Sequence, residues 1–213
     1  TFNLSLTNLK QVPSVALNST GAVTQTMDFT AAGAAGASDN LAVALNGTSA
    51  TNLTVSAQGS SKIETVTLTS STVANTVGTV DVSGAGTTKV VIAGDQGLTI
   101  TTITGTTVTT VDASAASGAV TLTLPNAGTY IGSSAADVVT ASSGADNLSG
   151  GAGNDTFVMA ANLTSSDTID GGAGTDIVSL SGTVADTAFT KVTNVETLTD
   201  SAVASPTLGA LAQ

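Results

Sequence analysis

Several residue types are missing from this 213-residue chain, and each absence excludes a class of protein. There is no cysteine and no histidine, which excludes disulfide bridges, the usual zinc and iron sites and histidine-dependent catalytic triads. The four basic residues are all lysines, and no stretch reaches 18 continuous apolar residues. We therefore expect neither nucleic-acid binding, which needs many basic side chains, nor a transmembrane helix.

Aromatic residues are also scarce, at 2% of the chain, although 41% of the residues are hydrophobic. A core with so few rings must be filled by stacked Val, Ile, Leu and Thr, which is typical of a solenoid of short strands. The net charge is −11, with 15 acidic residues, and this balance suits a protein that is completed by bound cations. The absence of cysteine suits a secreted polymer that must avoid random disulfides.

What the chain does contain is a nine-residue repeat between Gly132 and Ser179, interrupted once by a three-residue insertion at 159–161. The five units begin at Gly132, Ala141, Gly150, Asn162 and Gly171. Their sixth residue is always an aspartate: Asp137, Asp146, Asp155, Asp167 and Asp176. Their eighth residue is always apolar: Val139, Leu148, Phe157, Ile169 and Val178. This period predicts half a coil per unit, with the eighth residue facing the core.

The units from Gly150 and Gly171 match the calcium-binding pattern GGxGxDxUx completely. Their glycines permit positive φ and let carbonyl oxygens close around an ion, and their carboxylates supply the hard anionic oxygen that calcium prefers. Counting in frame places three pairs of aspartates on adjacent coils: Asp137 with Asp155, Asp146 with Asp167, and Asp155 with Asp176. The predicted calcium-binding residues are Asp137, Asp146, Gly150, Gly151, Gly153, Asp155, Asp167, Asp170, Gly171, Gly172, Gly174 and Asp176.

The other three units are degenerate. Those from Gly132 and Ala141 lack the glycine pair, and the one from Asn162 contains no glycine. Two interpretations of their aspartates stay open at this point: they hold an ion, or they cap turns.

At the complete units the chain resembles the RTX family, the calcium-dependent β-roll proteins of Gram-negative type I secretion. The Thr/Val/Ala/Gly-rich flanks and the phrase KVTNVETLTDS from Lys191 resemble a Gram-negative surface-layer (S-layer) protein. The resemblance implies Ca²⁺ as cofactor, an extracellular location on the cell surface, and subunits that assemble with one another in a lattice or filament. It also implies outer-membrane polysaccharide as a candidate anchor. The chain begins without Met, so we expect a fragment or a processed form.

The expected fold class is all-β: a parallel β-solenoid or β-roll, with a β-sandwich followed by a β-roll as the alternative. Residues 1–60 are expected to form a β-rich region with a flexible loop at Ala31–Asn40, and 61–131 a Thr/Val-rich solenoid. Residues 132–179 form the calcium-binding roll, and 180–213 supply further strands and a loose tail. Dense strand patterns begin at Leu41, Asn52, Lys62, Thr79, Lys89, Leu98, Thr107 and Val120.

The favoured function is a structural extracellular protein whose calcium-dependent folding drives self-assembly into a surface layer or similar polymer. The alternative is a calcium-binding accessory domain of a secreted adhesin or hydrolase. An enzyme is not expected. Glu64 and Glu196, the two glutamates, lie in similar strand-like phrases, and Asp81 and Asp112 share a V-x-x-V-D-x-S phrase that suggests turn or cap residues.

Overall fold

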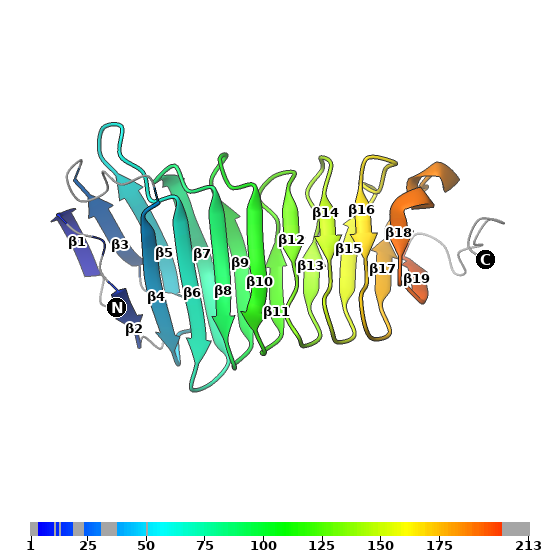
Figure 1. Cartoon of the computed structure of the whole chain (residues 1–213), viewed down its shortest axis with the longest axis horizontal. Coiled ribbons are helices and arrows are strands. Elements are labelled where there is room, and N and C mark those ends of the chain that lie inside the picture. The colour runs from blue at the N-terminus through cyan, green and yellow to red at the C-terminus, as the bar shows by residue number, and fades with distance from the viewer. Residues whose placement is uncertain are drawn as a thin grey trace.

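The computed structural model describes residues 4–10, 12, 14–18, 24–30, 38–49 and 51–201. Within these residues the chain winds into an elongated parallel β-solenoid, whose successive strands alternate between two sheets (Figure 1). The odd-numbered strands form a ten-stranded sheet and the even-numbered strands a nine-stranded sheet. Neighbouring strands of the described sheets pair in parallel, from β1 with β3 to β17 with β19. The predicted parallel solenoid is thus confirmed, and the sandwich alternative is wrong.

The odd-numbered strands are β1 (Leu4–Leu9), β3 (Thr24–Phe29), β5 (Thr51–Ala57), β7 (Asn75–Gly84), β9 (Leu98–Thr104), β11 (Val120–Thr123), β13 (Val138–Thr140), β15 (Thr156–Ala160), β17 (Ile177–Leu180) and β19 (Thr197–Asp200). The even-numbered strands are β2 (Ser14–Leu17), β4 (Asn40–Asn46), β6 (Thr65–Ser71), β8 (Lys89–Gly94), β10 (Thr110–Ala116), β12 (Thr129–Ile131), β14 (Asn147–Ser149), β16 (Thr168–Asp170) and β18 (Val192–Thr193). A 3₁₀ helix, η1 (Asp186–Lys191), precedes β18. Both sheets run without a break across residues 60, 131 and 179, where the domain boundaries were predicted.

The coils become shorter along the chain. A hydrogen bond between neighbouring coils spans 28 residues where Ser56 meets Asp28, but only 18 where Asp137 meets Asp155. Two nonapeptides therefore make one coil, which confirms the prediction of half a coil per unit. The insertion at 159–161 lengthens the next coil, so that Asp155 and Asp176 meet across 21 residues.

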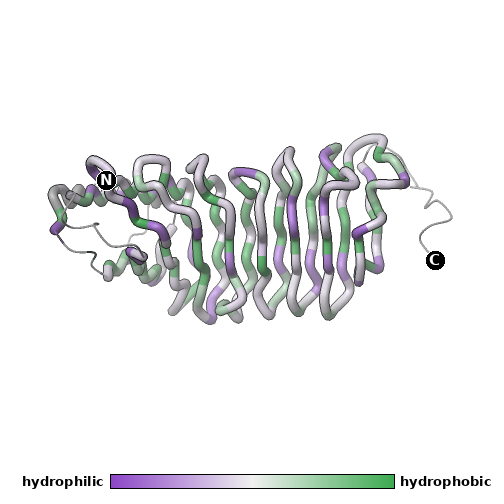
Figure 2. The backbone as a smooth tube through the Cα atoms, turned by 45° about the horizontal axis from the view of Figure 1, so that its top comes forward, coloured by the Kyte–Doolittle hydropathy of each residue, from purple (hydrophilic) through white to green (hydrophobic). Residues whose placement is uncertain are grey.

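The core of the repeat region consists of the eighth residue of each unit. Val139, Phe157 and Val178 pair in register across β13, β15 and β17, and each is about 1% exposed. Leu148 and Ile169 pair in the same way across β14 and β16, and both are fully buried. Side chains of a strand alternate between its two faces, so each three-residue strand sends only its central residue inward. Figure 2 shows the result as apolar stretches that recur from coil to coil.

Two predicted segments fall wholly or mainly on residues that the structure does not describe. They are the flexible loop at Ala31–Asn40, of which only residues 38–40 are described, and the tail, of which only the residues up to 201 are described. After Ser179, strands β18 and β19 extend the two sheets by one strand each, in agreement with the prediction of further strands there.

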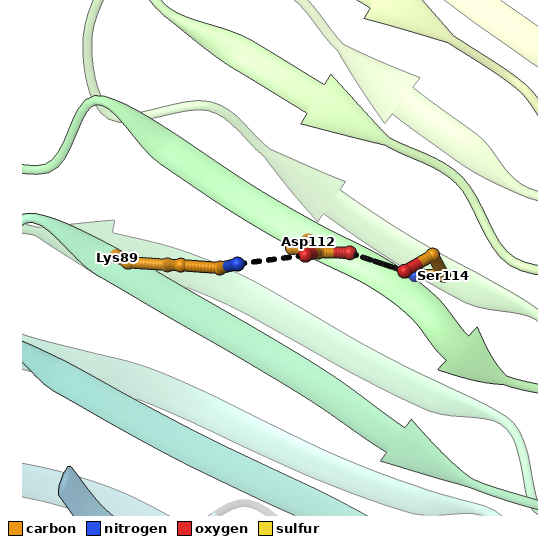
Figure 3. A network of polar contacts seen from close by, with 3 residues as sticks. All are labelled: Lys89, Asp112 and Ser114. Atoms are coloured by element: carbon orange, nitrogen blue, oxygen red, sulfur yellow. Dashed lines mark hydrogen bonds and ion pairs between the residues drawn. The ribbon is translucent and has the colours of Figure 1, made fainter.

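Asp81 and Asp112, predicted as turn or cap residues, lie within strands β7 and β10, beside irregularities in strand pairing, and not in turns between strands. Each accepts hydrogen bonds from the main-chain N–H and the hydroxyl of the serine two residues later. Asp112 also forms an ion pair of 2.8 Å with Lys89 on the neighbouring coil (Figure 3). The bulge brings each aspartate close to the serine two residues later, so that their hydrogen bonds can form. These contacts give both carboxylates a structural role on the outer face.

Asn75 was not singled out by its sequence, yet it is the main polar group of the wider coils. It is 2% exposed; its Oδ1 accepts from Thr48 N–H at 2.6 Å, and its Nδ2 donates to Leu45 O and Ser70 Oγ. We expect Asn75→Ala to lower the free energy of unfolding by about 2–4 kcal/mol, because buried groups lose their partners. Denaturant unfolding measures this, with the exposed Asn147→Ala as control. Equal effects of the two substitutions would contradict the assignment.

Candidate metal centre

The five repeat aspartates lie at two corners of the solenoid, each just before a strand. Asp137, Asp155 and Asp176 precede β13, β15 and β17 at one corner, while Asp146 and Asp167 precede β14 and β16 at the other. The two complete glycine loops, Gly150–Asp155 and Gly171–Asp176, therefore stack on adjacent coils of the same corner. Their main chains are joined by hydrogen bonds, from Ala173 N–H to Gly151 O and from Gly153 N–H to Ala173 O.

All five aspartates are at most 2% exposed. In each of the three pairs that were counted from the sequence, the later aspartate accepts a hydrogen bond through Oδ1 from the main-chain N–H of the earlier one. The bond lengths are 2.7 Å for Asp137 to Asp155, 2.8 Å for Asp146 to Asp167 and 2.7 Å for Asp155 to Asp176. One carboxylate oxygen of each residue is thus used to join coils, and the second oxygen decides whether an ion can bind.

Asp155 and Asp176 keep this second oxygen free. Their Oδ2 atoms are the buried side-chain polar atoms without a hydrogen-bond partner among the described residues. An unpaired buried carboxylate oxygen is costly, and a divalent cation is the partner that removes the cost. Among the described residues no three acidic side chains form a cluster that could hold a metal ion, so main-chain oxygens must supply most of the ligands here.

The glycines provide such oxygens. A Cβ added to Gly150 would contact both Asp155 Oδ2 and Gly171 O, and one added to Gly171 would contact both Asp176 Oδ2 and Asn194 O. Each glycine therefore lets the main chain approach one free carboxylate oxygen and one carbonyl oxygen of the next coil more closely than any side chain would allow. These two loops fit a calcium ion, which prefers hard oxygen ligands.

Positive φ at the second glycine shapes both loops in the same way. Gly151 and Gly172 both have φ of 95°, a conformation that L side chains rarely adopt. Gly153 and Gly174 follow with φ of 114° and 152°. A Cβ at Gly172 would overlap Gly151 O and one at Gly174 would overlap Gly153 O, so the spacing of the two loops depends on these glycines.

The remaining three aspartates have hydrogen-bond donors on both oxygens. Main-chain N–H groups of Ser133, Ser142 and Thr164 reach the Oδ2 atoms of Asp137, Asp146 and Asp167. Tyr130, which the sequence did not point to, donates its hydroxyl to Asp137 Oδ2 as well. In these loops both oxygens of the carboxylate already have a hydrogen-bond partner.

Three further residues complete the description of the corners. Asp170 ends strand β16, and its Oδ1 accepts a hydrogen bond from Asn194 Nδ2 at 2.7 Å. Glu196 Oε2 accepts from Asp176 N–H, and Glu64 Oε2 accepts from Asp39 N–H, both at 2.8 Å. The similar phrases around the two glutamates therefore reflect one role, which is that of the repeat aspartates in joining coils.

Burial sets the electrostatics of the glycine corner. It raises the pKa of Asp155 to about 6; the hydrogen bond from Asp137 N–H opposes this rise, and the charges of Asp137 and Asp176 add to it. Burial also raises the pKa of Asp146, against the hydrogen bonds from Ser142 and Gly128. Without a cation, ionised Asp155 is thus disfavoured in the folded chain.

We expect the calcium-free protein to lose stability as the pH rises from about 4 to about 7. Folding raises the pKa of Asp155 from 3.8 to about 6. The stability that this residue contributes is therefore fully present below the pKa of the unfolded chain, and it is lost as the pH rises through the pKa of the folded chain. Melting in chelator across this range measures the effect, and Asp155→Asn should reduce it. A melting temperature that rises over the same interval would contradict the expectation.

A parallel solenoid with stacked glycine loops and free aspartate oxygens at one corner defines a calcium-binding β-roll. A family model described as RTX calcium-binding nonapeptide repeat (4 copies) matches residues 129–158 and 163–182. The chain therefore contains RTX repeats, whose ion is calcium and which are typical of secreted extracellular bacterial proteins. No curated protein and no solved structure matches the chain significantly. None of its described helices has the length and apolarity to cross a membrane.

Proposed function

We propose that this chain is a structural protein of a Gram-negative cell surface, which folds on calcium outside the cell and then assembles with copies of itself into a surface layer. The observation that carries the proposal is the pair of buried, unpartnered oxygens of Asp155 and Asp176 in stacked glycine loops. Because the site exists only in the coiled chain, the free energy of calcium binding stabilises the folded state. Extracellular calcium modules bind with dissociation constants of about 10⁻⁴ to 10⁻³ M, so low cytoplasmic calcium leaves the site empty before secretion.

The outer face of the odd-numbered sheet supports assembly. One row of in-register, outward-facing residues crosses six coils without a charge: Thr76, Thr99, Thr121, Val138, Thr156 and Ile177. Val138 is 38% exposed, although it is apolar. Such a row repeats every 4.7–4.9 Å or so and offers a second copy a regular surface with no charge to desolvate.

The four carboxylates that the sequence analysis weighed for catalysis are bound in structural contacts, which supports a role in binding and assembly. Glu64 and Glu196 each accept a main-chain N–H, and Asp81 and Asp112 are engaged by serine hydroxyls. A glycosidase needs two neighbouring carboxyl groups that face a substrate, one of them with a raised pKa. The pKa values of Asp81 and Asp112 are lowered: partial burial opposes the change, and the hydrogen bonds outweigh it.

The decisive experiment is a calcium titration of the purified chain by circular dichroism, with electron microscopy of the same samples. We expect β-structure and ordered sheets or filaments to appear together at submillimolar to millimolar calcium. The variant Val138→Lys places a charge in the uncharged row; it should keep the calcium-dependent β-structure and lose the assembly.

Other outcomes would redirect the proposal. Calcium-dependent β-structure without any assembly would favour an accessory domain of a secreted adhesin or hydrolase. A chain that is folded equally in chelator and in calcium would remove the basis for both functions.

A further inference from the structure

The structure divides the five nonapeptide loops into two kinds, and we propose that only the two glycine loops take up calcium. In the other three, Ser133, Ser142 and Thr164 take the place of the ion at Asp137, Asp146 and Asp167. The proposal rests on calcium binding at the glycine loops, which is part of the proposed function, and it goes further by assigning which carboxylates need no ion.

The geometry is the same in the two serine loops. Ser133 donates to Asp137 twice, from N–H to Oδ2 and from Oγ to Oδ1, each at 2.8 Å. Ser142 donates to Asp146 in the same manner, from N–H to Oδ2 at 2.9 Å and from Oγ to both oxygens at 3.0 Å. In both units the serine stands at the second position, where the complete units have glycine.

The third loop reaches the same arrangement with a different residue. Thr164 stands at the third position of its unit and donates to Asp167 Oδ2 from N–H at 2.7 Å and from Oγ1 at 3.0 Å. In all three loops the hydroxyl oxygen also accepts the main-chain N–H of the residue two positions later. The hydroxyl thus bridges the turn and the carboxylate, and it fixes the loop in a closed form.

These donors compete with a cation for the same oxygen. The hydrogen of an N–H group carries positive partial charge, and in these loops it points at the Oδ2 atom that would have to ligate calcium. Each carboxylate instead accepts hydrogen bonds on both of its oxygens. In the glycine loops the corresponding Oδ2 atoms of Asp155 and Asp176 have no donor.

The position of the first residue adds an independent contrast. The three atoms nearest to a Cβ at Gly132 would be main-chain atoms of Ser149 and Gly150, and none of them is a carboxylate oxygen. The units from Ala141 and Asn162 already carry a side chain there. Of the three units that begin with glycine, only those from Gly150 and Gly171 have an aspartate Oδ2 among the atoms nearest to this position.

The test combines calcium stoichiometry by calorimetry with melting in saturating calcium. Wild-type protein should bind no more than two ions per chain, and Asp155→Asn/Asp176→Asn should bind none. The triple variant Ser133→Ala/Ser142→Ala/Thr164→Ala should keep the wild-type stoichiometry but melt at a lower temperature in calcium. The matched control is Ser134→Ala/Ser143→Ala/Ser165→Ala, whose exposed hydroxyls neighbour the proposed ones and should change neither quantity.

If the triple variant does not fold, the single variant Ser142→Ala replaces it in the test. We expect its melting temperature at saturating calcium to be lower than that of the wild type by on the order of 5 °C. Three or more ions bound to the wild type would overturn the proposal, because the hydroxyl loops would then hold calcium. A Ser142→Ala protein as stable as wild type in calcium would overturn it as well. No bound calcium in the wild type would instead reject the proposed function.

Discussion

Withdrawing calcium at neutral pH is expected to open the coils from β13 to β17, while the coils from β4 to β11 keep their structure. Chelation leaves Asp155 Oδ2 and Asp176 Oδ2 buried and without a partner. The wider coils have no such atom among their described residues and keep an aliphatic core that includes Leu68, Ile92 and Ile100, each at most 1% exposed. A solenoid coil contacts only its neighbours, so one end can open while the other stays folded.

Amide hydrogen exchange, measured separately for peptides along the chain, detects this local opening directly. Calcium at 10 to 100 times the dissociation constant stabilises by about 1.4–2.7 kcal/mol per site, so protection around β15 and β17 should fall roughly 10- to 100-fold in chelator. Magnesium should not restore it, because this smaller ion gives up its water reluctantly. Uniform loss of protection along all coils would contradict the local origin of the effect and would mean that the solenoid unfolds as one unit.

Replacing Phe157 by alanine is expected to destabilise the repeat region by about 3–5 kcal/mol. Phe157 is 1% exposed and lies in register between Val139 and Val178, so its removal leaves a cavity in the centre of a stack of three coils. It also sits two residues after Asp155, and loss of its packing should weaken calcium binding through the strand that positions the loop.

Two matched variants separate packing from other effects. Phe157→Leu retains most of the buried volume and should cost much less than Phe157→Ala. Val158→Ala changes the neighbouring side chain, which faces outward and is half-buried, and should have a small effect on denaturant unfolding. Similar losses for Phe157→Ala and Val158→Ala would show that the eighth position is not the centre of the core.

The core of the repeat region could be predicted because its cause is local. A period of nine, with an apolar residue at the eighth position, fixes which side chain of each short strand points inward, and Leu148 and Ile169 are fully buried as this pattern requires. Asp81 and Asp112 do cap the main-chain N–H groups of Ser83 and Ser114, but their position within strands could not be predicted. The bulges that hold these residues depend on how strands of unequal length pair with their neighbours. No residue pattern within β7 or β10 predicts the position of these bulges.

The sequence by itself determined the period of the coil, the alternation of its core, the calcium-binding class of its two complete loops and the pairs of aspartates that meet. Only the tertiary structure decided which aspartates have a free oxygen. Whether Asp137 or Asp155 can bind an ion depends on donors and carbonyls that loop conformation and the neighbouring coil bring into place, such as Tyr130 for the first and Gly171 for the second. A residue pattern specifies the carboxylate; hydrogen bonding in the folded coil determines whether that carboxylate is already satisfied.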